Sequence, residues 1–428
     1  MSSARATVLQ APVLPVLRYS EPHSACPPGI DRSDSIPTEL WIIIFSLLSK
    51  TDLFACARLK KRLSLTARHV LYRALEFSDF ASAWSNIRFW RSGDATPFRR
   101  VPRSISIGSD GGKDPLVAIL MDTVASLRSI TDITIVNQNV HPLKLFAMTQ
   151  GRRLSSLTLR SVIFGPPNGS YAEDFAFKGK NALSTASRLL SYLTFVPPTP
   201  SHVSLVGVYW YPRLDPMHLL PRTVGSRYVT SLELDVHSFL MIEDAFSSTS
   251  STFGNNVQSF RLLSTKSRFG SELDQGKMEI LRRRLLTLSS SLSMLVIQAT
   301  CIDVFQGCAI NLPNLREFNG PEEILPLLGE CAQVEKLVVR LNDRKTEFPV
   351  TLRFSWANVR ALSILRWSGD VGAISSILRS VHGTESFELE CMSSITTVCA
   401  CATQEYVAKP FSGVLDALGT SAGYCGGT

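Results

Sequence analysis

The stretch VEKLVV at residues 334–339 has the spacing apolar-x-x-apolar-x-apolar, and the same spacing recurs along most of the chain. Further copies begin at residues 130, 154, 229, 257, 292 and 359. Because side chains alternate across a strand, each copy predicts a short strand whose second apolar residue is a buried anchor. With LPNLREF and TESFEL added, the predicted anchors are Ile133, Leu157, Leu232, Phe260, Leu295, Leu315, Leu337, Leu362 and Phe387.

The segments between these copies have helical character, as in residues 114–129, 270–286 and 371–383. Strands that alternate with helices predict an α/β fold with a parallel sheet, whereas a β-sandwich would show short strands without this helical filler. From Leu295 onward the anchors lie 20, 22, 25 and 25 residues apart. This part of the sequence resembles an irregular leucine-rich-repeat array, whose repeats are about 20–29 residues long. The resemblance implies a solenoid with a curved parallel sheet.

The middle of the array is less regular. Between Leu157 and Leu232 either Leu193 or Leu205 fits the anchor position, and the two are too close together for both to be regular anchors. The sequence leaves this choice open.

The N-terminal region contains SIPTELWIIIFSLLSKTDLFACARL at residues 35–59. Its apolar run is about half the roughly 20 residues needed to span a membrane. As a helix, the run has one apolar stripe of Leu40, Ile43, Ile44 and Leu47 and a second of Trp41, Phe45 and Leu48. A capping box at 49–52 predicts a second helix, and residues 64–77 predict a third. A short helix that is apolar on both faces must be covered on all sides, so a second polypeptide is a plausible cover.

These residues resemble an F-box, the three-helix module that docks a substrate receptor onto the Skp-type adaptor of a cullin-RING ubiquitin ligase. Ile36 replaces the usual leucine, and the run 58–62 is more basic than is common in the family. An ordinary helical hairpin is the alternative interpretation. The resemblance implies that the adaptor-binding residues are Ile36, Pro37, Leu40, Ile44, Leu48, Leu53 and Leu59.

An F-box followed by irregular leucine-rich repeats resembles the large fungal-type F-box families, and LPNLREFNGPEEIL at 312–325 is similar to a segment they often carry. The predicted organisation has five parts. These are a disordered segment (1–34), the F-box (35–78), a helical linker (79–129), the repeat array (130–392) and a C-terminal tail (393–428).

Composition and motifs exclude several function classes. The chain has 428 residues, 45% of them hydrophobic and 19% charged, with no window of transmembrane length and no clean signal peptide, so we expect a cytoplasmic or nuclear protein. Its nine cysteines form no C-x-x-C pair, which excludes a RING-type zinc site, and Cys391, Cys399 and Cys401 with His382 match no familiar zinc spacing. There is no P-loop, G-x-S-x-G or H-E-x-x-H motif. We therefore expect no enzyme, metal or cofactor.

The net charge of +8 allows two further uses of the basic residues. The clusters at 60–62, 99–103 and 282–284 lie far apart and lack interleaved aromatics, so they indicate solvated faces more than a nucleic-acid site. Residues interleaved with the anchors, among them Asp235, should face out of the concave side of the sheet. Four arginines there are the predicted client-binding residues: Arg160, Arg261, Arg316 and Arg340. Arg316 and Arg340 fall on consecutive repeats and are predicted to share one anionic group.

Three functions from different classes remain. The chain could be a substrate receptor that binds adaptor, cullin and an unknown client, a repeat scaffold that binds the adaptor without delivering clients, or a basic nucleic-acid binder. The first accounts for both the F-box and the array.

Overall fold

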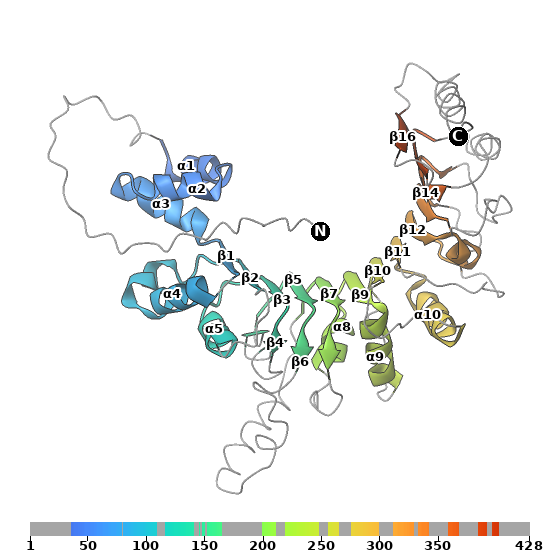
Figure 1. Ribbon diagram of the computed structural model, residues 1–428, viewed down its shortest axis with the longest axis horizontal. Helices are drawn as coiled ribbons and strands as arrows, with labels where there is room; N and C mark the ends of the chain where they lie inside the picture. Colours follow the sequence, from blue (N-terminus) through green and yellow to red (C-terminus); the bar gives the residue numbers. More distant parts are fainter. Residues whose placement is uncertain are drawn as a thin grey trace, which may run out of the picture. The chain divides into compact units, whose positions relative to one another are not determined.

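The structure is a computed structural model (Figure 1). The chain divides into two compact units. Unit 1 comprises Met1–Pro198 and Tyr209–Met217, and unit 2 comprises Thr199–Val208 and His218–Thr428. The residues described are 36–78, 80–108, 116–140, 145, 148–149, 152–164, 199–210, 219–247, 256–264, 275–298, 311–328, 333–341, 358–367, 384–391 and 396–401.

Unit 1 begins with the three predicted helices, which are α1 (Thr38–Ser46), α2 (Lys50–Cys56) and α3 (Lys61–Leu71). Pro37 precedes α1 with φ −55°, a value that its ring imposes. Ser49 caps α2, since its hydroxyl accepts a hydrogen bond from the Asp52 N–H at 3.2 Å. The predicted cap by Ser49 is therefore confirmed, while the Asp52 carboxylate accepts a hydrogen bond from the Ser49 hydroxyl at 2.7 Å and not from the Ser49 N–H that a full capping box would use.

The rest of unit 1 is a parallel sheet with helical connections. Its strands run in sequence order as β1 (Ala74–Phe77), β2 (Ser104–Gly108), β3 (Asp132–Val136) and β5 (Ser156–Arg160). The connections include α4 (Phe80–Arg91), a 3-10 helix η2 (Gly93–Phe98) and α5 (Leu116–Ala125). A small second parallel sheet contains β4 (Asn139–Val140), β6 (Ile163–Phe164) and β8 (Tyr209–Trp210).

Two boundary predictions in unit 1 were wrong. The third helix ends at Leu71, and residues 74–77 form β1, because Leu75 and Phe77 are buried while Ala74 and Glu76 are exposed. The segment 79–129 is not a purely helical linker, since β2 lies within it and pairs with β1 and β3. The parallel sheet therefore begins at residue 74 and not at 130.

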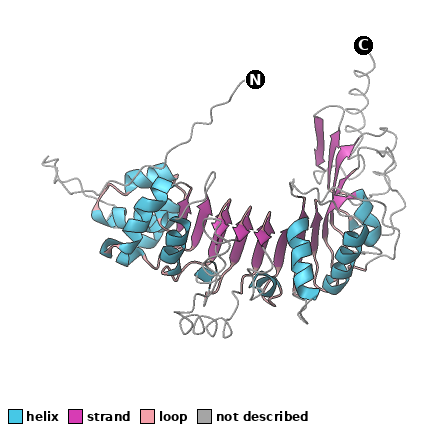
Figure 2. Cartoon of the chain, turned by 60° about the horizontal axis from the view of Figure 1, so that its bottom comes forward, coloured by secondary structure: helices cyan, strands magenta, loops and turns pink. Residues whose placement is uncertain are grey.

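Unit 2 repeats the same arrangement. Its parallel strands are β7 (His202–Val206), β9 (Ser231–Asp235), β10 (Ser259–Leu263), β11 (Met294–Ile297), β12 (Glu317–Pro321), β13 (Lys336–Arg340), β14 (Ala361–Trp367) and β15 (Ser386–Cys391). A final strand, β16 (Thr396–Cys401), pairs antiparallel with β15, so part of the predicted C-terminal tail belongs to the sheet. The helices α8 (Leu219–Val224), α9 (Val236–Ser247), α10 (Gln275–Leu288) and the 3-10 helix η5 (Glu322–Leu328) connect strands (Figure 2). The predicted α/β fold with a large parallel sheet is confirmed, and the predicted helix at 371–383 lies outside the described residues.

The anchors form continuous rows in the core. All nine predicted anchors are no more than 1% exposed. Leu232, Phe260 and Leu295 are register partners on neighbouring strands, as are Ile133 and Leu157 in unit 1. Leu315 is buried as predicted but is not the strand anchor, because Phe318 pairs with Leu295 and Leu337 while Leu315 lies in the turn before β12.

The irregular middle of the array has a clear anchor as well. Val203 pairs with Leu232, so the Leu205 alternative was wrong, because Leu205 lies two residues further along β7. The Leu193 alternative lies outside the described residues.

A backbone ladder explains how irregular repeat lengths keep a regular sheet. The residue just before a strand, here called the pre-strand residue, accepts two N–H groups from the next repeat: the Arg316 carbonyl accepts from Glu335 and Lys336 at 2.8 and 3.0 Å. The same double acceptance occurs at Arg73, Arg103, Thr131, Ser201, Thr230, Gln258, Ser293, Glu335 and Arg360. Each turn is therefore fixed to its neighbour through the backbone, whatever the length of the connection that precedes it.

Arg152 terminates α5 in unit 1. Its guanidinium donates to the carbonyls of Val124, Ala125 and Leu127 at 2.9, 2.8 and 2.6 Å, at the end of the helix where carbonyls lack intrahelical partners. Burial lowers the pKa of the Arg152 guanidinium. The charge is tolerated because the carbonyls surround it.

We expect Arg152→Met to destabilise unit 1 by about 2–3 kcal/mol, because it keeps the aliphatic stem and leaves three partly buried carbonyls without their charged donor. Arg153→Met, at an exposed neighbouring arginine, should change stability by less than about 0.5 kcal/mol. Thermal unfolding of the full chain measures both, and equal melting temperatures for the two variants would contradict a capping role for Arg152.

Candidate interaction surfaces

The two apolar stripes of α1 have different environments. Phe45 is 3% exposed and packs in a small core with Leu53, Ala57 and Ala67, against which Trp41 and Leu48 also pack. The other stripe faces outward, with exposed fractions of 49% at Leu40, 58% at Ile43, 42% at Ile44 and 82% at Leu47. The described part of the chain thus covers only one face of α1. The name "α1 stripe" is used below for the four outward residues.

The predicted adaptor-binding residues divide accordingly. Pro37, Leu40, Ile44 and Leu59 are exposed, while Ile36 and Leu48 are half-buried. Leu53 is only 5% exposed and belongs to the core of the module, because it lies on the same face of α2 as Ala57. It is not available to a partner, so that prediction was wrong.

Sequence reasoning omitted three exposed apolar residues from the predicted site. Ile43 and Leu47 already belong to the stripe at positions i+3 and i+7 from Leu40, so the helical spacing could have identified them. Leu65 on α3 is 46% exposed and had no such signal.

Side-chain contacts fix α1 within the module. The Arg62 Nη2 atom donates to the Ile36 carbonyl at 2.8 Å and to the Thr38 Oγ1 at 3.2 Å, which joins α3 to the start of α1. The Ser64 hydroxyl donates to the Ala57 carbonyl at 2.7 Å, which joins α3 to the end of α2. The unusually basic run 58–62 therefore supplies a structural contact through Arg62.

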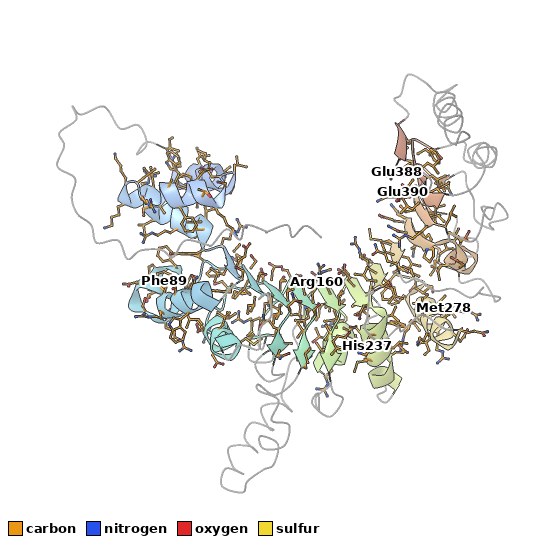
Figure 3. All side chains as sticks on the ribbon, viewed as in Figure 1. Phe89, Arg160, His237, Met278, Glu388 and Glu390 are labelled. Carbon is orange, nitrogen blue, oxygen red and sulfur yellow. The ribbon has the colours of Figure 1, made fainter. Side chains whose placement is uncertain are left out.

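An aromatic cluster joins the end of α3 to the following elements of unit 1. Tyr72 lies 5.3, 5.4 and 5.1 Å, between ring centroids, from Phe89, Trp90 and Phe98. Burial raises the pKa of the Tyr72 hydroxyl, and the positive charge of Arg68 lowers it to a smaller extent. Figure 3 labels Phe89 on α4.

On the sheet, residues interleaved with the anchors lie on the face opposite the buried row. Arg160 is exposed at the end of β5 in unit 1, and Glu388 and Glu390 lie on this face of β15 in unit 2 (Figure 3). Asp235 does not follow the prediction for this face. It is fully buried and accepts hydrogen bonds from the N–H groups of Ser238 and Gly207, both at 2.8 Å, which places it as a cap at the start of α9.

The charges on this face of unit 2 pair largely with one another. Arg261 lies 4.0 Å from Glu233, whose other oxygen accepts from the Ser204 hydroxyl at 2.8 Å. Lys336 pairs with Glu317 at 2.9 Å. An anionic ligand would therefore have to compete with acids already in place.

The predicted pairing of Arg316 with Arg340 was wrong. Arg316 is a pre-strand residue, whereas Arg340 is the last residue of β13 and pairs with Pro321. The two arginines stand at opposite ends of neighbouring strands, about 16 Å apart along the strand direction. They cannot form one compact site.

Arg316 instead belongs to a groove at the edge of unit 2 where the strands begin. The groove has a volume of about 830 Å³ and is lined by the turns before β9, β10, β11 and β12. Arg227 and Arg316 come from the first and last of these turns, and the residues between them are uncharged and polar. We call it the pre-strand groove.

The basic cluster at 282–284 is not simply solvated. Arg284 of α10 forms a bidentate ion pair with Glu243 of α9, and Arg282 pairs with Glu279 at 3.1 Å. Only Arg283 is exposed. The cluster therefore helps to join two helices of unit 2.

No protein-family model matches the sequence, and no curated protein matches it significantly. Within the described ranges, none of the helices combines the length and apolarity needed to cross a bilayer. The same ranges hold no group of three His, Cys, Asp or Glu side chains arranged to bind a metal ion.

Proposed function

We propose that the chain is the substrate receptor of a cullin-RING ubiquitin ligase, in which the F-box-like module of unit 1 docks a Skp-type adaptor and the repeat array binds the client. In this role the chain supplies binding surfaces and no catalytic residues, and it acts in the cytoplasm or nucleus.

The α1 stripe is the observation that carries the proposal. Three large apolar side chains of α1 and that of its C-cap residue, Leu47, are exposed while the opposite face of the helix packs in a core. Contiguous exposed apolar side chains favour a protein-binding surface. The sequence around them resembles an F-box, whose partner is the adaptor.

The repeated strand-and-turn unit supports the second half of the proposal. Each repeat contributes one strand, one buried anchor and one pre-strand carbonyl, as expected for a leucine-rich-repeat-like solenoid. Such arrays offer long binding surfaces made of side chains from successive repeats.

Co-expression of the full chain with a Skp-type adaptor and a cullin tests the proposal. A substrate receptor should purify with both proteins, whereas a scaffold should purify with the adaptor alone. Failure to recover the adaptor would contradict the F-box assignment.

Nucleic-acid binding is the alternative that one observation favours. Exposed arginines occupy neighbouring turns at the strand-start edge of unit 1, among them Arg73, Arg103, Arg128 and Arg153. If they bind phosphates, the affinity for duplex DNA or RNA should fall steeply with salt concentration. Weak binding with little salt dependence would remove this alternative.

A further inference from the structure

The pre-strand groove of unit 2 is built by a repeated contact. The Asn256 side-chain amide donates to the Arg227 carbonyl at 2.8 Å, and the Asn314 amide donates to the Ser290 carbonyl at 2.7 Å. Each asparagine lies two residues before the pre-strand residue of its own turn. Each accepting carbonyl lies in the preceding turn, three residues before the pre-strand residue of that turn. These contacts join the turn before β10 to the turn before β9, and the turn before β12 to the turn before β11.

Serine hydroxyls reinforce the floor of the groove. Ser291 donates to the Val257 carbonyl at 2.9 Å and Ser293 donates to the Gln258 carbonyl at 3.1 Å. The Gln258 side chain lines the groove and is exposed. The floor therefore offers amide and hydroxyl groups, which suit the N–H and C=O groups of an extended main chain.

The described residues that line the groove carry only positive charge. No described residue that lines it carries a carboxylate, whereas Arg227 and Arg316 stand in its outermost turns. Tyr228 orients Arg227: its hydroxyl oxygen lies 2.9 Å from the Arg227 Nη2, and its ring centroid lies 5.0 Å from the guanidinium carbon.

Arg316 is not neutralised by its neighbours. The adjacent Glu317 is paired with Lys336, and Glu335, the next pre-strand residue, does not line the groove. In the described part of unit 2, no carboxylate lies within ion-pair distance of either groove arginine. Both guanidinium groups can therefore accept an anionic partner, and a guanidinium pairs with a carboxylate through two parallel hydrogen bonds.

The spacing of the two arginines sets the length of the ligand. Their turns are three strand spacings apart, which is about 14 Å in the direction across the strands, although Arg227 lies three residues before its pre-strand residue and Arg316 is itself one. In an extended peptide, residues i and i+4 are also about 14 Å apart. The volume of about 830 Å³ falls within the range of about 300–1,000 Å³ typical of ligand-binding clefts.

We propose that the pre-strand groove binds an extended acidic peptide segment that carries two carboxylate side chains four residues apart. One carboxylate pairs with Arg227 and the other with Arg316, while the intervening main chain lies across Gln258 and the asparagine and serine side chains. The inference rests on the proposed function in one respect, that the peptide belongs to a client of the receptor.

Fluorescence anisotropy with labelled peptides of equal composition tests the proposal on the purified full chain. The two glutamates are placed two, four or six residues apart in a Ser/Thr/Gly background. We expect the four-residue spacing to bind about tenfold more tightly than either of the others, because only this spacing reaches both guanidinium groups. Arg227→Gln and Arg316→Gln should each remove this preference.

Arg360→Gln is the matched control. Arg360 is an exposed pre-strand arginine two strands beyond Arg316, and it does not line the groove. The affinity and the spacing preference should both be unchanged in this variant. An equal loss for Arg360→Gln and Arg316→Gln would show that only total charge matters and would overturn the proposal.

A charge swap gives an independent test. The Arg316→Glu variant should lose affinity for the peptide with two glutamates. It should gain affinity for a peptide in which lysine replaces one of the two glutamates. Equal affinity for all three spacings, or tighter binding of a peptide with a single phosphoserine, would overturn the assignment. The adaptor takes no part in these measurements. A chain that binds the adaptor but not the peptide would contradict this inference alone. A chain that binds the peptide but not the adaptor would contradict the proposed function alone.

Discussion

Replacing Leu40 and Ile44 by aspartate is expected to abolish binding of the Skp-type adaptor while the chain remains folded. Both side chains are outside the core of the module, with exposed fractions of 49% and 42%, so their loss removes little packing. At an interface, each would contribute about 1 kcal/mol from the surface it still exposes. Two carboxylates buried there without partners add a penalty of several kcal/mol, so the affinity should fall by at least about a thousandfold.

The measurement is a pull-down of the adaptor at equal expression, with circular dichroism to check folding. Leu286→Asp is the matched control, because Leu286 on α10 is also 49% exposed and lies in unit 2. It should bind the adaptor like the wild type. Leu53→Asp should also lose binding, but through unfolding of the module, since Leu53 is in its core. Undiminished recovery of the adaptor with the double variant would contradict the F-box assignment.

Local patterns in the sequence predicted the repeated elements well. The apolar-x-x-apolar-x-apolar spacing identified strands because its first, second and third apolar residues are all buried, as Leu292, Leu295 and Ile297 show. Ser49 could be predicted as a cap because the bond it makes spans only three residues. Information of this kind lies within a few residues and needs no knowledge of the tertiary structure.

The errors come from the same local view. Leu315 and Phe318 both fit an anchor position three residues apart, and only pairing with β11 and β13 decides between them. The strand β1 is short enough for its two buried residues to resemble the end of a helix. Leu53 was assigned to a partner because its sequence position matches the family, although its own helix directs it into the core.

The pre-strand groove could not be predicted because it combines four turns separated by 23 to 35 residues in the chain. Its residue types are common in turns and carry no motif. Only the regular stacking of the pre-strand residues brings Arg227 and Arg316 to the same surface. A signal did exist in the paired asparagines, Asn256 and Asn314, which occupy the same place in their turns.

Gly320→Val is expected to destabilise unit 2 even though it restores the apolar pattern of its neighbours. In β11 and β13 the equivalent positions hold Ile297 and Val339, both fully buried. In β12 the ring of Phe318 fills this space: a Cβ atom on Gly320 would lie 2.8 Å from the Phe318 Cζ and 3.2 Å from the Ile297 carbonyl oxygen. Overpacking of this kind costs about 1–3 kcal/mol, and the backbone contact leaves the strand little freedom to move aside.

The double variant Phe318→Leu with Gly320→Val decides whether the pair is the cause. It recreates the Leu-x-Ile and Leu-x-Val pairs of the neighbouring strands, so most of the lost stability should return. Phe318→Leu alone should also destabilise the unit, because it leaves a cavity beside the glycine. Chemical denaturation of the four proteins gives the interaction free energy of the cycle, which should be favourable by at least about 1 kcal/mol because the two positions touch. Additive effects would mean that the Phe318 ring does not occupy the space that a side chain at position 320 would fill. The pairing of Phe318 with Gly320 would then not explain why β12 lacks the apolar residue that β11 and β13 have at this position.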